Sequence, residues 1–182
     1  PLRRRRQMCK RERFTADMHS EANKLIEDAD LLKAHQFVED SGPSAHPIRP
    51  ERVEEFNNIY TGTIYEKGSH VLGMLHTLLG EQTWRKATDT YFDRFDGQAV
   101  TCDDFVDVMQ EVSGIDLTHF RQWYKQSGTP EITYKGEYDA ASKKYTLTLT
   151  QHTPATLDQA DKAPLFMPIK VGLIGESGND ID

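Results

Sequence analysis

The 182-residue sequence contains few of the features that mark secreted or membrane proteins. No apolar run approaches the ~18–20 residues that span a bilayer. The arginines near the start are followed by charged residues rather than by the apolar stretch of a signal peptide. The two cysteines, Cys9 and Cys102, are too few for a disulfide scaffold. These absences favour a reducing, cytoplasmic setting.

The sequence also contains none of the short motifs that mark common catalytic sites. It has no C-x-x-C, no Walker A loop, no G-x-G-x-x-G and no G-x-S-x-G. No two of its seven histidines are four residues apart, so no helical H-x-x-x-H metal pair exists. Cys102 precedes Asp103 and Asp104, whose charges disfavour its thiolate and make it a poor nucleophile. We therefore assign no metal ligands to this chain.

Charge is distributed unevenly along the chain. Residues 1–13 hold seven basic residues and one acidic residue, whereas the other 169 residues carry a net charge of −13. A basic arm on an acidic body can bind nucleic acid or an anionic membrane surface. This arm has no aromatic residue on which a base could stack. We therefore interpret residues 1–13 as a solvated or out-of-frame arm and expect no nucleic-acid partner.

Helical patterns fill residues 14–128. A first helix is expected from about Thr15 to Phe37, before three prolines within eight residues break the pattern. Apolar residues at i, i+3, i+4 and i+7 then predict a helix from Tyr65 to a C-cap at Gly80. Three more helices are expected, from Glu81 to Phe95, from an N-cap at Thr101 to Gly114, and from Asp116 to Gly128.

The pattern changes after Pro130, where alternation predicts β-strands. We expect strands at Glu131–Glu137, Lys144–His152 and Phe166–Ile174, with EYDAASKK as the hairpin turn between the first two. Three strands leave an open edge and an uncovered face, so residues 129–182 are interpreted as a truncated antiparallel β domain. The fold class is α+β, and apolar faces left uncovered favour self-association.

Two tyrosines stand just ahead of the second helix, in YTGTIYEKG at residues 60–68. A phenol is a neutral donor near pH 7, because its ordinary pKa is about 10. Such a donor at the start of a helix can stabilise an oxyanion in a cleft. Spacing alone favours the other interpretation, in which Tyr60 and Tyr65 are two amphipathic residues at a domain surface, so the residues by themselves do not assign a site.

The region from Phe14 to about Ile174 resembles the bacterial type of aminopeptidase N, a zinc-dependent alanyl aminopeptidase of the gluzincin class. The matching stretches are AHPIRP (45–50), NNIYTGTIYEKG (57–68), HTLLGE (76–81), DGQAVTCDDFV (96–106), DLTHFRQWYKQSGTP (116–130) and QHTPATLDQADKAPLFMPI (151–169). The resemblance implies that the helices are the C-terminal part of a thermolysin-like catalytic domain. It implies that the strands begin the following Ig-like β-sandwich domain, with the boundary near Gly128–Pro130.

The resemblance also implies roles for three residues. In this family a zinc ion polarises the carbonyl of a peptide substrate, and the tyrosine of YEKG donates to the oxyanion that forms. Tyr65 matches that tyrosine. Asn57 and Tyr60 match residues that line the pocket for the first side chain of the substrate.

The sequence departs from the family at its start. The zinc motif H-E-x-x-H and the later glutamate ligand are absent, and PLRRRRQMCK does not resemble the family. We expect a frameshifted or truncated product, a fragment of an alanine-preferring peptidase that is inactive alone. The alternative is a non-catalytic helical and β module that binds a protein, or an anionic partner through its basic arm.

Overall fold

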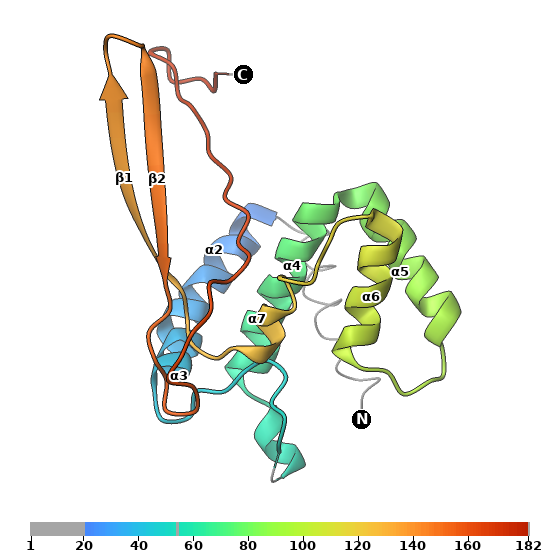
Figure 1. Cartoon of the computed structure of the whole chain (residues 1–182). Coiled ribbons are helices and arrows are strands. Elements are labelled where there is room, and N and C mark those ends of the chain that lie inside the picture. Colours follow the sequence, from blue (N-terminus) through green and yellow to red (C-terminus); the bar gives the residue numbers. More distant parts are fainter. Residues whose placement is uncertain (1–20, 54, 182) are drawn as a thin grey trace.

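The computed structural model describes residues 21–53 and 55–181, which form a helical body and a projecting β-hairpin (Figure 1). The hairpin stands away from the helices, and the chain then returns to the body before its last residues (Figure 1). Within the described ranges, no helix is both long and apolar enough to cross a membrane. The elements, in chain order, are α2 (Glu21–Leu31), η1 (Leu32–Gln36), α3 (Phe37–Ser41), η2 (Phe56–Ile59), η3 (Thr63–Lys67), α4 (Gly68–Leu79), α5 (Glu81–Phe95), α6 (Cys102–Ser113), α7 (Gln122–Lys125), β1 (Glu131–Asp139) and β2 (Lys144–His152).

The first predicted helix is observed as the continuous run of α2, η1 and α3. It ends at Ser41, four residues beyond the predicted end, because Gly42 turns to extended backbone and Pro43 follows. The predicted start at Thr15 lies outside the described residues. Much of its expected apolar face is exposed: Leu25, Ile26 and Phe37 keep 55%, 63% and 38% of their surface.

The end of α4 and both ends of α5 and α6 fall where local chemistry predicts. Gly80, with φ of 74°, ends α4 and starts α5. Thr101 and Asp104 form a reciprocal capping box at the start of α6, each side chain bonded to the other's backbone N–H. Gly114 ends that helix in the left-handed conformation. These boundaries follow from short-range signals.

The fifth predicted helix, from Asp116 to Gly128, is shorter than expected. Asp116 accepts from the backbone N–H of Thr118, and i to i−3 backbone bonds continue the turn, so α7 covers Gln122–Lys125 alone. Its apolar side chains are nonetheless buried as predicted. They join one core built from α4, α5, α6, α7 and a later segment of the chain: Val71, Leu75, Leu79, Ala87, Val106, Met109, Leu117, Phe120, Trp123, Tyr124 and Leu165.

β1 and β2 form an antiparallel hairpin, with Glu131 opposite His152 and Asp139 opposite Lys144. The reversal begins at Asp139, whose carboxylate accepts from the N–H of Ala141. The prediction of two antiparallel strands is confirmed, but β1 runs two residues further than predicted, to Asp139, so the turn is shorter than EYDAASKK.

The prediction of a third strand at Phe166–Ile174 is wrong. The described sheet has two strands, and Ile174 makes an isolated bridge to Asp180. The segment starts against the helices instead, because Leu165 enters the core and the indole of Trp123 donates to the carbonyl of Phe166 at 2.6 Å. Pro168 then removes a backbone donor that a ladder would need.

Gly128, at the junction of helices and hairpin, is predicted to tolerate no side chain. Its φ is +87°, and a Cβ would lie 3.2 Å from Thr153 Cγ2. We expect Gly128→Ala to lower the free energy of unfolding by about 2–4 kcal/mol, combining left-handed strain and overpacking. Gly114→Ala is the matched control, because Gly114 has φ of +70° with open space around it. Urea titration followed by far-UV circular dichroism measures both, and equal losses would contradict crowding at Gly128.

Candidate active site

Tyr65 lies in η3, a π-helical turn that leads directly into α4. Its backbone N–H donates to the carbonyl of Thr61 at 3.1 Å. The N–H of Gly68 reaches back five residues to the carbonyl of Thr63, the bond that defines a π turn. Such turns occur often at functional sites. The predicted helix start at Tyr65 is therefore observed two residues earlier, with an unusual geometry.

The structure brings Tyr60 and Tyr65 together. Their rings are stacked, with centroids 6.0 Å apart and planes 19° from parallel. Tyr60 keeps 60% of its surface exposed, whereas Tyr65 is half-buried. Asn57 belongs to η2, one short turn earlier, and its carbonyl accepts from the N–H of Tyr60 at 3.3 Å. The three residues predicted to form a site thus share one local segment.

The start of η3 is held by the carboxylate of Glu39. Glu39 Oε1 accepts from the N–H of Thr63 at 2.8 Å and from its hydroxyl at 2.6 Å, and Oε2 accepts from the N–H of Gly62 at 3.3 Å. A carboxylate placed there satisfies backbone donors that no helical carbonyl reaches. Thr63 is completely buried and also accepts from the amide of Gln36 at 3.3 Å. Glu39 therefore caps the turn that carries Tyr65.

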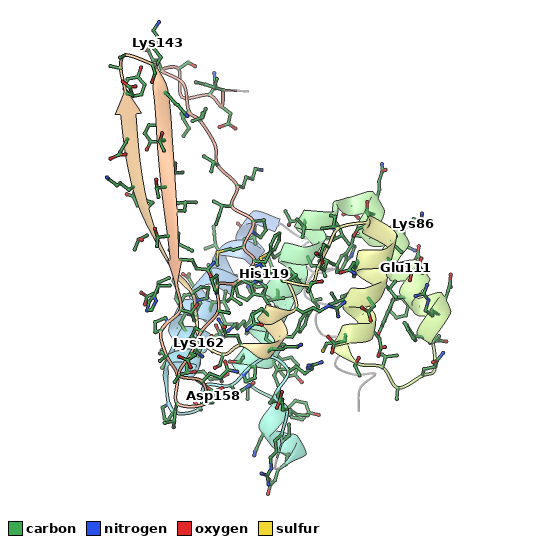
Figure 2. The ribbon with its side chains drawn as sticks, in the orientation of Figure 1. Lys86, Glu111, His119, Lys143, Asp158 and Lys162 are labelled. Atoms are coloured by element: carbon green, nitrogen blue, oxygen red, sulfur yellow. The ribbon has the colours of Figure 1, made fainter. Side chains whose placement is uncertain are left out.

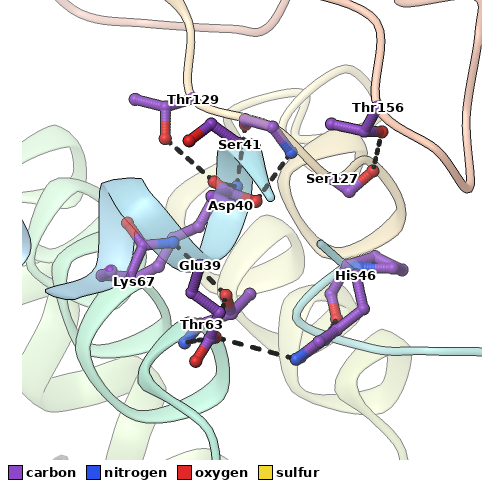
Figure 3. Close-up of polar contacts among 12 residues, drawn as sticks. Glu39, Asp40, Ser41, His46, Thr63, Lys67, Ser127, Thr129 and Thr156 are labelled. Carbon is purple, nitrogen blue, oxygen red and sulfur yellow. Dashed lines mark hydrogen bonds and ion pairs between the residues drawn. The ribbon is translucent and has the colours of Figure 1, made fainter. Parts of the chain in front are cut away.

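The end of η3 is held by a buried ion pair between Lys67 and Asp40 (Figure 3). Lys67 Nζ lies 2.7 Å from Asp40 Oδ2 and 2.9 Å from the carbonyl of Gly128. Asp40 also accepts from the N–H of Gly128 at 2.7 Å and from the hydroxyl of Thr129 at 3.0 Å. Asp40 is fully buried and Lys67 nearly so. One ion pair thus joins α3, η3 and the junction that leads to β1.

The protonation of Asp40 follows from these contacts. Burial would raise the pKa of Asp40, but the charge and hydrogen bond of Lys67 and the N–H of Gly128 outweigh it, so the pKa lies below its ordinary value. Asp40 therefore stays ionised at neutral pH and keeps Lys67 paired.

A second cation, Lys162, fixes the chain that returns from β2. Its ammonium donates to the carbonyl and hydroxyl of Ser127 at 3.0 and 2.9 Å and to the hydroxyl of Thr156 at 2.6 Å. Burial lowers the pKa of Lys162, against the attraction of Asp158. Figure 2 places Asp158 and Lys162 where the returning chain meets the helical body, far from Lys143 at the hairpin tip. Two charged groups therefore fix the junction at Gly128. The Asp40–Lys67 pair contacts Gly128, and Lys162 contacts the neighbouring Ser127.

Sequence reasoning missed Glu39, Asp40 and Lys67. The helix was expected to end at Phe37, which left the acidic pair outside it. A signal was present, because acidic residues are unfavourable at a helix C-terminus unless something compensates their charge. Two adjacent carboxylates at the end of α3 therefore indicate cationic or N–H partners elsewhere in the chain.

The residues described do not fit a zinc site. Among them, no three His, Cys, Asp or Glu side chains are grouped closely enough to hold a metal ion. His76 instead pairs with Glu81, with Nε2 2.8 Å from Oε2. At η3, the side chain available for chemistry is the phenol of Tyr65, on a turn that Glu39 and Asp40 hold at its two ends.

Removing the charge of Asp40 is expected to destabilise the fold strongly. Asp40→Asn would leave Lys67 buried without its counter-ion, at a cost of about 3–5 kcal/mol in the free energy of unfolding at pH 7. The control is Asp89→Asn, which removes an exposed i,i+4 partner of Arg85 and should cost under about 0.5 kcal/mol.

The difference between wild type and Asp40→Asn should depend on pH. Because the folded pKa of Asp40 is lowered, its stabilisation is complete above the unfolded pKa near 3.8 and is lost as pH falls through the folded value. Denaturant titrations from pH 7 down to pH 2 should show the two proteins converging at the acid end. A constant difference across this range would contradict an ionised Asp40.

Comparison with known proteins places this segment in a family. Residues 9–124 match the description "Peptidase family M1 domain", and residues 128–182 match a domain of unknown function with an Ig-like fold. Aminopeptidase N of Escherichia coli is 49% identical over 170 residues, which cover 93% of this chain and 20% of that protein. Aminopeptidase N of Haemophilus influenzae is 47% identical over 92% of this chain and 19% of its own length.

A solved structure supports the same relationship. The crystal structure of Legionella pneumophila aminopeptidase A in complex with aspartic acid matches with a TM-score of 0.57 and 29% identity, over 59% of this chain and 13% of that one. The chain spans about a fifth of the length of the two aminopeptidase N sequences. From residue 9 to residue 124, through the η3 turn and the helices that position it, the chain belongs to peptidase family M1.

Proposed function

We propose that this chain is part of a zinc-dependent aminopeptidase and that it supplies Tyr65 as a hydrogen-bond donor to the tetrahedral oxyanion. The observation that carries the proposal is the fixing of η3 at both ends, by Glu39 and by Lys67, in a chain of peptidase family M1. A donor fixed before reaction stabilises developing charge without the cost of reorienting in the transition state.

The chemistry of tyrosine suits this role. Its phenol is protonated near neutral pH and donates one strong hydrogen bond to an anionic oxygen. An oxyanion donor of this kind typically contributes about 10²–10³ in kcat. Phenylalanine keeps the ring and removes the donor, so it isolates the contribution of the hydroxyl.

We assign substrate contacts to Asn57 and Tyr60. The exposed ring of Tyr60 stacks on Tyr65 and leaves one side open to a ligand. Asn57 lies in the adjacent turn with an exposed amide. The ring of Tyr60 and the amide of Asn57 would then line a pocket for the first side chain of the substrate, and this pocket suits a small side chain such as that of alanine. The rest of the peptide would continue past Tyr65.

The metal of the complete enzyme would be held outside this chain. The sequence has no H-E-x-x-H, and the described residues offer no set of three ligands. Among the described residues, the polarisation of a substrate carbonyl and a metal-bound nucleophile therefore have no source. The same reasoning makes the isolated chain a scaffold for Tyr65 rather than an enzyme.

The isolated chain is expected to have no aminopeptidase activity. Purified protein at micromolar concentration, with equimolar zinc, should release p-nitroaniline from alanyl-p-nitroanilide no faster than zinc in buffer. Zinc-dependent release that disappears on Tyr65→Phe would contradict this expectation and would locate a complete site within these 182 residues.

The role of Tyr65 is tested by grafting. Residues 14–174 replace the matching segment of the Escherichia coli aminopeptidase N, and the chimera is expected to hydrolyse alanyl-p-nitroanilide. Tyr65→Phe in the chimera should lower kcat by about 10²–10³, with a much smaller change in KM, because the lost bond forms mainly in the transition state.

Tyr138→Phe is the matched control for the graft, because Tyr138 lies on the hairpin and is 64% exposed. It should leave kcat within about twofold of the chimera. An active chimera in which Tyr65→Phe keeps full kcat would overturn the proposed role. That result would favour the alternative function, a non-catalytic binding module.

A further inference from the structure

The peptide group that joins Ser127 to Gly128 is hydrogen-bonded to charged side chains on both sides. Its carbonyl oxygen, which belongs to Ser127, accepts from the ammonium of Lys162 at 3.0 Å. Its N–H, which belongs to Gly128, donates to Asp40 Oδ1 at 2.7 Å. The carbonyl of Gly128, in the next peptide group, accepts from Lys67 Nζ at 2.9 Å. Three charged side chains thus hold two successive peptide groups.

These charges come from both family regions of the chain. Asp40 and Lys67 lie within residues 9–124, the match to peptidase family M1. Lys162 lies within residues 128–182, the match to the Ig-like domain, or the Ig-like region. The Ig-like region therefore contributes a cation to the network that holds the end of η3.

Lys162 is itself fixed where it meets the carbonyl of Ser127. Its ammonium also donates to the hydroxyl of Ser127 at 2.9 Å and to that of Thr156 at 2.6 Å. The hydroxyl of Ser127, a completely buried residue, donates to Asp158 Oδ1 at 2.8 Å. The attraction of Asp158 and Asp40 favours the charged form of Lys162. Its contact with the peptide group therefore has one defined geometry.

The peptide group between Ser127 and Gly128 couples Lys162 to Asp40. An amide is planar, so its oxygen and its N–H rotate together. A cation at the oxygen also polarises the amide and strengthens the bond that the N–H donates to a carboxylate. Asp40 accepts from this N–H with Oδ1 and from Lys67 with Oδ2. A shift of the peptide plane therefore displaces the carboxylate and, with it, the ammonium of Lys67.

Lys67 is connected to Tyr65 by the backbone of η3. It is the last residue of that five-residue turn and follows Tyr65 by two positions. The N–H of the next residue, Gly68, donates to the carbonyls of Thr63 and Tyr65. Because the turn is so short, a displaced Lys67 changes the backbone that carries the phenol.

We propose that Lys162 is a positioning residue for Tyr65, acting through the peptide group between Ser127 and Gly128. The inference rests on the oxyanion role proposed above for Tyr65. Lys162 affects the reaction only through that phenol. The Ig-like region is then part of the catalytic arrangement, because it sets the turn from which the oxyanion donor acts.

The first test uses the chimera of residues 14–174 with the Escherichia coli enzyme. Lys162→Met keeps an unbranched side chain and removes the ammonium. It should lower kcat about tenfold or more, but no further than Tyr65→Phe does, with KM within about twofold. Lys143→Met is the matched control, because Lys143 is exposed at the hairpin tip (Figure 2), and it should leave kcat within about twofold.

A double variant separates positioning from a general loss of stability. In the Tyr65→Phe background, Lys162→Met should change kcat by less than about twofold, because the hydroxyl through which it acts has already been removed. A purely structural role of Lys162 would lower kcat by the same factor in both backgrounds.

NMR of the 182-residue chain tests the coupling without any activity. The amide signal of Gly128 and the ring signals of Tyr65 report the two ends of the connection. Lys162→Met should shift both sets of signals, and Lys143→Met should shift neither. This measurement decides the inference even where the chimera is inactive.

Three results would overturn the inference while leaving the role of Tyr65 intact. The first is a chimera in which Tyr65→Phe lowers kcat but Lys162→Met does not. The second is an equal loss of kcat on Lys162→Met with and without the hydroxyl of Tyr65. The third is a Lys162→Met chain whose Tyr65 signals are unshifted. A chimera in which Tyr65→Phe keeps full kcat would instead overturn the proposed function, and this inference with it.

Discussion

The ion pair between Asp40 and Lys67 is the constraint on which the arrangement of this chain depends. It connects residues 27 positions apart, and through Gly128 it reaches 88 positions from Asp40 to the junction with the hairpin. Burying two charges is costly, and here the cost is offset because Asp40 also accepts from a backbone N–H and a threonine hydroxyl. Because Asp40 and Lys67 both have hydrogen-bond partners, the pair holds α3, η3 and the junction before β1 in one arrangement.

That geometry explains how a short turn keeps one conformation. η3 is five residues long and carries little helical stability of its own. Glu39 fixes its first residues and Asp40 fixes its last, so consecutive residues of α3 hold both ends. Tyr65 lies between these anchors, and this rigid placement supports the role proposed for it as an oxyanion donor.

The sequence predicted those helix boundaries that depend on residues close to them in the chain. The bounds of α5 and the capping box of α6 follow from glycine, threonine and aspartate within a few residues of each boundary. It did not predict the extension of the first helix to Ser41 or the contacts of Asp40, because those depend on partners far along the chain. Phe166–Ile174 alternates like a strand, yet Leu165 draws its start into the helical core. The spacing of the tyrosines left the role of Tyr65 open, and a family resemblance suggested it.

The most direct test of the account is a crystal structure of the chimera with a phosphinic peptide, whose tetrahedral oxygens mimic the oxyanion. The account predicts that Tyr65 Oη lies about 2.5–3.0 Å from one of those oxygens. It also predicts that the Asp40–Lys67 pair is intact in the complex. A phenol directed away from the inhibitor, with the pair intact, would contradict the claim that this turn exists to present Tyr65 to a reacting carbonyl.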